Sequence, residues 1–89
     1  MASSVLVGRQ VKYLSEFGFE VSERPAKGYK IESYYLPTNS VKEVIVTKVE
    51  GDVEKEIARV SSLDNVIDLV KAFEGYPQKL VEVILQILK

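Results

Sequence analysis

The sequence predicts an α+β domain in which a four-stranded, mostly antiparallel β-sheet packs against three helices, in the order αββββαα. Three observations lead to this prediction. Apolar residues recur at helical spacing near both ends of the chain, they alternate with polar residues in the middle, and Gly- and Pro-containing turns separate the segments. The chain has 89 residues. Because a core of this size cannot be divided, we expect one domain covering residues 1–89.

The first predicted helix begins near the N-terminus, where Ser3 or Ser4 can cap it, and ends at Gly18. Its apolar residues are three or four positions apart and would form one buried face: Leu6, Val7, Val11, Leu14 and Phe17.

Two hairpins are predicted next. Residues 19–23 alternate between apolar and polar, and the turn at 24–28 leads into a second strand at 29–36. Residues 41–49 are the most β-branched run in the chain, and the turn at Gly51 and Asp52 returns the chain as a fourth strand at 53–60.

Two helices are predicted to complete the chain. Ser61 and Ser62 can cap the second helix, and Gly75 ends it. Pro77 suits the first turn of a third helix that runs to Lys89. The apolar side chains expected along one face of the second helix are Leu63, Val66, Ile67, Val70 and Phe73.

The last helix has more apolar surface than one buried face requires. Beside one stripe of aliphatic residues lies a second stripe, formed by Val81, Leu85 and Leu88. Leaving these three side chains in water would forgo about 5 to 9 kcal/mol, at about 1.5 to 3 kcal/mol each. Either another helix of the same chain covers them, or they form the centre of a homodimer. We expect the dimer slightly more than the intrachain cover.

The hairpin at Gly51 and Asp52 has two competing registers. A two-residue type II′ turn would place Lys48 opposite Lys55 and Val44 opposite Arg59. A three-residue loop would instead place Lys48 opposite Glu54 and give favourable charge pairs. The first register predicts a cationic sheet face, and the second predicts that the charges largely cancel.

An alternative function follows from the first register. A cationic sheet face beside tyrosines could bind a nucleic-acid single strand, with bases stacking on the rings and phosphates meeting the basic side chains. Strand tyrosines are more often packing residues and strand lysines more often protect a sheet edge, so this stays the second choice. The candidate residues are Arg24, Lys27, Tyr29, Lys30, Tyr34, Tyr35, Lys42, Lys48, Lys55 and Arg59.

Composition narrows the classes of function further. The chain contains neither cysteine nor histidine and has a net charge of −1. The usual ligands for zinc, copper, haem and iron–sulfur clusters are therefore missing, as are the residues of Ser/His/Asp and Cys/His catalysis. We expect no metal, no cofactor and no enzymatic activity. Carboxylates at 50, 52, 54 and 56 are expected only to solvate an exposed strand.

The lack of cysteine fits an intracellular protein, so we expect a cytoplasmic one. The apolar run at the start is too short for a signal peptide, and no segment is long enough to span a membrane. The scarcity of thermolabile residues leans towards a thermophilic source. Together these patterns predict a small, non-enzymatic binding or assembly module. Its partners would be a second copy of itself and another protein, with nucleic acid as the alternative.

Overall fold

The first element that the computed structural model describes is a strand, and the prediction that a helix runs through these residues is wrong. The structure describes residues 8–61 and 66–89, and β1 spans Gly8–Ser15. It pairs antiparallel with β3 along its whole length. Val11 and Leu14 fit a helical spacing, but only Leu14 reaches the core. Long-range pairing overrides the local pattern here. The predicted caps Ser3 and Ser4, with Leu6 and Val7, lie outside the described residues.

The next two strands do not form the predicted hairpin with each other. β2 covers only Glu20–Val21 and pairs with β1, whereas β3, Lys27–Tyr35, pairs with the other side of β1. The strand predicted at 19–23 is therefore short and the partner predicted for it is wrong. Gly28 lets β3 begin close to β1, because a side chain at this position would overlap the carbonyl oxygen of Leu14.

The second hairpin is confirmed. β4, Val41–Glu50, and β5, Val53–Ser61, are joined at Gly51 and Asp52. Gly51 has φ 59°, as the first central position of a type II′ turn requires. Lys48 faces Lys55, as the two-residue register predicts. A bulge opposite Val46 and Thr47 then shifts the pairing by one residue.

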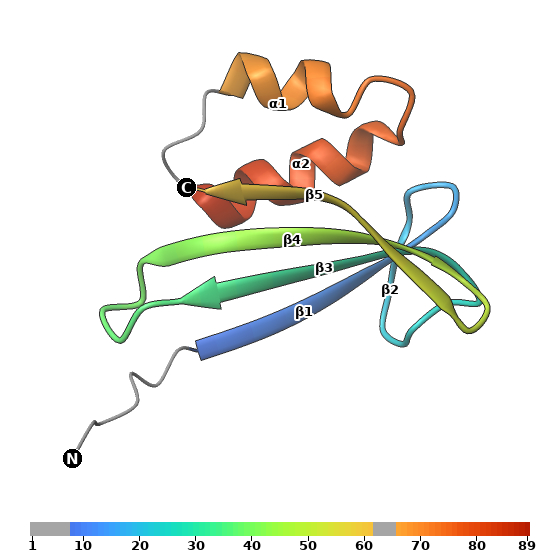
Figure 1. Ribbon diagram of the computed structural model, residues 1–89, viewed down its shortest axis with the longest axis horizontal. Helices are drawn as coiled ribbons and strands as arrows, with labels where there is room; N and C mark the ends of the chain where they lie inside the picture. Colours follow the sequence, from blue (N-terminus) through green and yellow to red (C-terminus); the bar gives the residue numbers. More distant parts are fainter. Residues whose placement is uncertain (1–7, 62–65) are drawn as a thin grey trace.

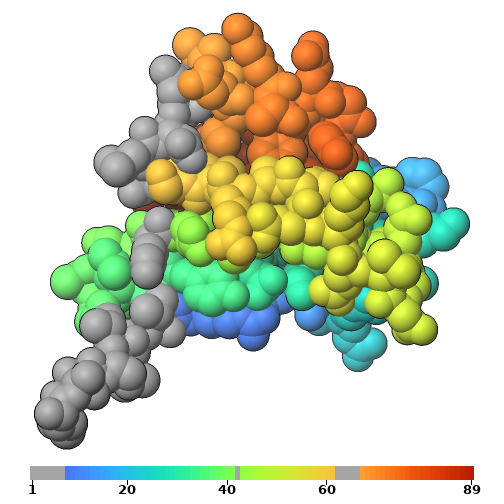
Figure 2. All heavy atoms as spheres, in the orientation of Figure 1, coloured from blue at the N-terminus to red at the C-terminus, as the bar shows by residue number. Residues whose placement is uncertain are grey.

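All five strands form one antiparallel sheet in the order β2-β1-β3-β4-β5. Both helices lie along one side of it, and the sheet twists strongly towards the β4–β5 hairpin tip, which extends beyond the helices (Figure 1). In the space-filling view the helices form the upper layer, and β5 runs below them across the middle of the molecule (Figure 2). The other side of the sheet carries no helix from residues 8–61 and 66–89.

The α+β class and the antiparallel sheet are confirmed, but the structure has five strands and two helices in its described residues. α1 spans Val66–Ala72 and α2 spans Gln78–Leu88. The predicted cap Ser61 belongs to β5, while Ser62 and Leu63 lie outside the described residues. Pro77 precedes α2 as its N-cap residue rather than lying in the first turn. Neither described helix has the length and apolar composition needed to cross a membrane.

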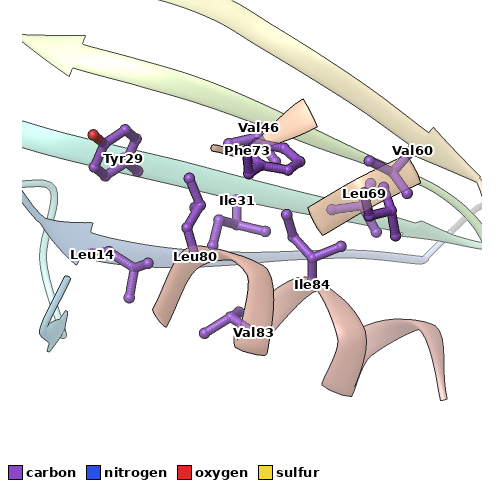
Figure 3. Packing of buried hydrophobic residues seen from close by; sticks show 11 residues of the cluster. Leu14, Tyr29, Ile31, Val46, Val60, Leu69, Phe73, Leu80, Val83 and Ile84 are labelled. Atoms are coloured by element: carbon purple, nitrogen blue, oxygen red, sulfur yellow. The ribbon is translucent and has the colours of Figure 1, made fainter. Parts of the chain in front are cut away.

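The core lies between the helices and the sheet (Figure 3). Strand residues enter it at alternate positions, as Tyr29 and Ile31 of β3 do, while α2 contributes three fully covered side chains. Burying each of these aliphatic groups stabilises the fold by about 1.5 to 3 kcal/mol. The cluster comprises Leu14, Tyr29, Ile31, Val44, Val46, Val60, Leu69, Phe73, Leu80, Val83 and Ile84.

Candidate protein-interaction surface

An open groove of about 400 Å³ lies between α1 and α2. Val70 and Phe73 line it from the α1 side, and Val81 and Leu85 line it from α2. We call this depression the helix groove. Its walls are mainly aliphatic and aromatic, so a matching apolar side chain could be removed from water there.

α1 leaves two large apolar side chains in solvent. Ile67 is 64% exposed and Val70 is 53% exposed. Both were predicted to share one apolar face with Phe73. Phe73 is buried, but Leu69 is the α1 residue that lies with it in the core, so the prediction is wrong for Ile67 and Val70. The helix has an apolar residue on almost every side, so spacing alone could not tell which ones face the sheet.

The three predicted dimer residues of α2 occupy two different places. Val81 and Leu85 are half-buried against the core and also line the helix groove. Leu88 is half-buried too, but it borders a separate depression near Tyr35 and Val41. Their own chain therefore covers part of the second apolar stripe. Within the two described helices, the large apolar side chains that are most exposed belong to α1 rather than to α2.

The charged residues that line the helix groove are both acidic. Glu74 and Glu82 are exposed there, and Lys71 is exposed on α1 directly after Val70. A partner that fills this groove should therefore combine an apolar side chain with a nearby positive charge.

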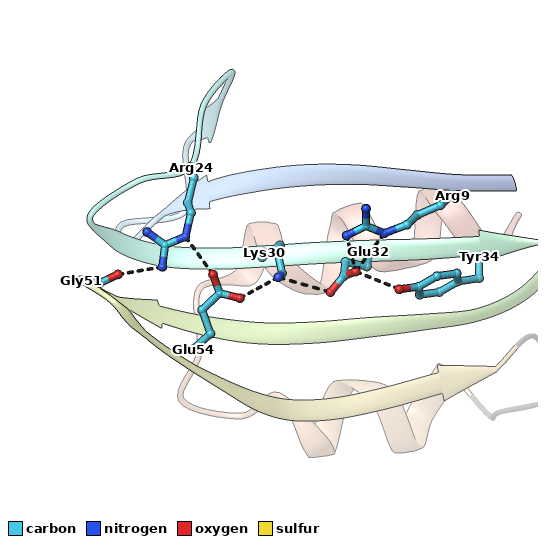
Figure 4. A network of polar contacts seen from close by, with 7 residues as sticks. All are labelled: Arg9, Arg24, Lys30, Glu32, Tyr34, Gly51 and Glu54. Atoms are coloured by element: carbon cyan, nitrogen blue, oxygen red, sulfur yellow. Dashed lines mark hydrogen bonds and ion pairs between the residues drawn. The ribbon is translucent and has the colours of Figure 1, made fainter.

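The helix-free side of the sheet carries a network of paired charges (Figure 4). Glu32 Oε2 accepts hydrogen bonds from Arg9 Nη2 at 2.7 Å and from the Tyr34 hydroxyl at 2.9 Å. Lys30 Nζ lies 3.5 Å from Glu32 Oε1 and donates to Glu54 Oε1 at 2.6 Å. The network continues from Glu54 to Arg24.

Arg24 closes this network against the hairpin turn. Its Nε donates to Glu54 Oε2 at 2.9 Å, and its Nη2 donates to the carbonyl oxygen of Gly51 at 2.7 Å. Arg59 of β5 likewise donates hydrogen bonds to two carboxylates, Glu56 of β5 at 2.9 Å and Glu43 of β4 at 3.3 Å. The cations on this side of the sheet are thus matched by carboxylates.

The network changes the proton affinity of its members. Burial alone would raise the pKa of Glu32, but the hydrogen bonds from Arg9 and Tyr34 and the charge of Lys30 outweigh it, so the pKa is lowered. Hydrogen bonds from Lys30 and Arg24 lower the pKa of Glu54. Both carboxylates are therefore held in their charged form.

The tyrosines proposed as a base-stacking platform do not share a surface. Tyr29 is buried in the core beneath the helices, where its ring packs edge-on against Tyr76. Tyr34 lies on the helix-free side and bonds to Glu32. Tyr35 lies next to it in sequence, and its hydroxyl accepts a hydrogen bond from Ser33 on the helix side. Only Tyr34 lies beside the charge network.

The basic residues proposed to bind nucleic acid also lie on different sides of the sheet. Arg24, Lys30 and Arg59 belong to the paired network on the helix-free side. Lys48 and Lys55 pair in the same register as Tyr29 and so lie on the helix side. Lys27 borders a small depression near Tyr29, and the side chain of Lys42 lies outside the described part of the chain. The cationic face expected from the two-residue register is divided by the bulge in β5.

The turn between β1 and β2 exposes two aromatic rings, and the prediction that Phe17 lies on the buried face of a helix is wrong. Phe17 is 77% exposed and Phe19 is 70% exposed. The turn is held by hydrogen bonds from Ser15 N to Phe19 O at 2.7 Å and from Phe19 N to Ser15 Oγ at 3.1 Å. The Phe-Gly-Phe sequence was the available signal, since a central Gly favours a turn over a helix.

Comparisons with protein-family models, with curated proteins and with solved structures found no match for this chain. Among residues 8–61 and 66–89, no three Asp or Glu side chains are grouped so that they could hold a metal ion.

Proposed function

We propose that this protein is a non-enzymatic binding and assembly module that pairs with a second copy of itself through the helix groove. The exposure of Val70 beside that groove carries the proposal. A valine at 53% exposure gains free energy when it is covered, and the groove offers apolar walls within the same surface.

A two-fold arrangement uses both features at once. In a reciprocal contact, Val70 of each copy enters the groove of the other and packs against its Val81 and Leu85. Lys71, adjacent to Val70, then approaches Glu74 and Glu82 of the second copy. Opposite charges at the rim favour this orientation and add to the apolar contact.

Sedimentation equilibrium of wild type and Val70→Glu tests the proposal. Because Val70 already faces solvent, the substitution leaves the monomer folded while placing a charge in the contact. We expect a wild-type mass of two chains and a variant mass of one. Val53→Glu is the matched control, since Val53 is 68% exposed on the β4–β5 hairpin and does not line the helix groove, and it should remain dimeric. A wild-type monomer at high concentration would overturn the proposal.

Nucleic-acid binding has weaker support. A phosphate backbone would have to displace the carboxylates already bonded to Arg24, Lys30 and Arg59, and only one of the candidate tyrosines lies beside these groups. The net charge of −1 adds no general attraction for a polyanion.

A further inference from the structure

The β4–β5 hairpin carries two lysines directly opposite each other. Lys48 and Lys55 are register partners on the helix side of the sheet. Like charges in this position destabilise a hairpin, because the side chains start only about 5 Å apart. Lys48 is compensated by Glu50, whose Oε1 lies 3.0 Å from its Nζ. Lys55 has no ion pair within the described part of the chain.

These lysines border a concavity of about 360 Å³ at the end of the helix layer. Its other lining residues are Glu50, Val53, Ile57 and Tyr76. Val53 is 68% exposed and lies on the same side of β5 as Lys55. The cavity therefore combines an apolar and aromatic wall with two ammonium groups and one carboxylate, a net charge of +1 (two lysines minus one glutamate).

We propose that this concavity binds a single anionic group, carboxylate or phosphate, attached to an aromatic or aliphatic group. The anion would lie between Lys48 and Lys55 and relieve their repulsion, while the apolar part would cover Val53, Ile57 and Tyr76. One anion fits better than a chain of phosphates, because Glu16 and Glu50 offset Lys27 and Lys48 in the adjoining depression, which therefore has no excess positive charge for a second phosphate. Such a group can belong to a small metabolite or to an acidic and aromatic segment of a polypeptide.

The test is a titration of the isotope-labelled full chain followed by backbone amide NMR, with phenyl phosphate as the probe. We expect saturable shifts at Lys55, Ile57 and Tyr76. Phenyl phosphate should bind at least about tenfold more tightly than inorganic phosphate or benzyl alcohol, each of which carries only half of the required chemistry. If these amides show no saturable shifts at up to about 10 mM probe, the affinity is weaker than millimolar and the proposal is overturned.

Two variants assign the effect to the lysine pair. Lys55→Met keeps the aliphatic stem and removes the charge, so it should weaken phenyl phosphate binding about tenfold. It should also leave the ligand-free fold at least as stable as wild type, because the repulsion with Lys48 is gone. Lys12→Met, at an exposed position of β1 that does not line the concavity, is the matched control and should bind as wild type does. If both substitutions weakened phenyl phosphate binding equally, the lysine pair would not form a specific site.

A second probe separates the two sources of the ligand. A blocked Glu-Phe dipeptide that binds more tightly than phenyl phosphate would identify a polypeptide segment, and the reverse order would identify a small organic anion. Both probes can be compared on the Val70→Glu monomer, so the outcome does not depend on self-association through the helix groove.

Discussion

Val70 of α1 and Leu85 of α2 line one apolar groove, while other apolar residues of the same two helices are buried in the core. Leu69 of α1 and Phe73, directly after α1, are buried in the core, and Val70 stays exposed at the rim of the groove. Because an exposed apolar side chain lies next to an apolar depression, each of two copies can cover the exposed side chain of the other.

Charge reversal tests the reciprocal contact. Lys71→Glu or Glu82→Lys should each weaken dimerisation about threefold to tenfold, because rim charges contribute up to about 1 kcal/mol per contact. The double variant should recover most of the affinity, since the opposite charges are restored with exchanged positions. Sedimentation velocity over a concentration series provides the measurement. A double variant weaker than either single variant would contradict the proposed orientation.

Acid should weaken the sheet through Glu32. Its pKa is lowered in the folded protein, so its stabilising contribution is present above the unfolded glutamate pKa of about 4.3 and is lost as pH falls through the folded value. The urea midpoint of wild type should therefore decrease more between pH 6 and pH 3 than that of Glu32→Gln. Glu23→Gln, at an exposed loop position, is the control and should follow wild type. Parallel curves for wild type and Glu32→Gln would show that the network does not act in this way.

Replacing Gly28 should damage the β1–β3 pairing. An added Cβ would overlap the carbonyl oxygen of Leu14 and lie 2.9 Å from Pro25 Cγ, so Gly28→Ala should destabilise the fold by about 1 to 3 kcal/mol in urea denaturation. At Gly8 the nearest atom to an added Cβ is 3.6 Å away, and Gly8→Ala should change stability by less than about 0.5 kcal/mol. Equal stability of the two variants would mean that β3 can begin elsewhere.

Labelled single-stranded DNA and RNA should show no salt-sensitive binding to this protein. The bonded carboxylates of Glu32, Glu54 and Glu56 already occupy the cations of the helix-free side. Fluorescence anisotropy at two low salt concentrations provides the measurement. Micromolar association that weakens with salt, and that Arg59→Ala also weakens, would restore the nucleic-acid alternative.

The central and C-terminal elements could be predicted because their local signals agree with their final pairing. Residues 41–49 are strongly β-branched, and the Gly51–Asp52 turn fixes a hairpin without help from distant residues. The first strand could not be predicted in this way. Val11 and Leu14 suit a helix, and only the pairing of residues 8–15 with β3 decides that they form a strand.

The sequence predicts an apolar interaction surface but not where that surface lies. The excess apolar surface of α2 is visible in the sequence, and Val81 and Leu85 do line the helix groove. The sequence could not place Val70 at the rim, because that depends on how α1 lies over the sheet. The bulge places Lys48 and Lys55 on one side of the sheet and Arg59 on the other. It arises from strand pairing, and no residue type in this segment predicts it.

Disulfide trapping between two single-cysteine variants tests the helix-groove dimer most directly, since the chain has no cysteine of its own. Val70→Cys and Val81→Cys proteins are mixed under mild oxidation. Rapid formation of the mixed disulfide is predicted, well ahead of a mixture of Val53→Cys with Val81→Cys. Equal rates in the two mixtures would show that Val70 of one copy does not meet the groove of another.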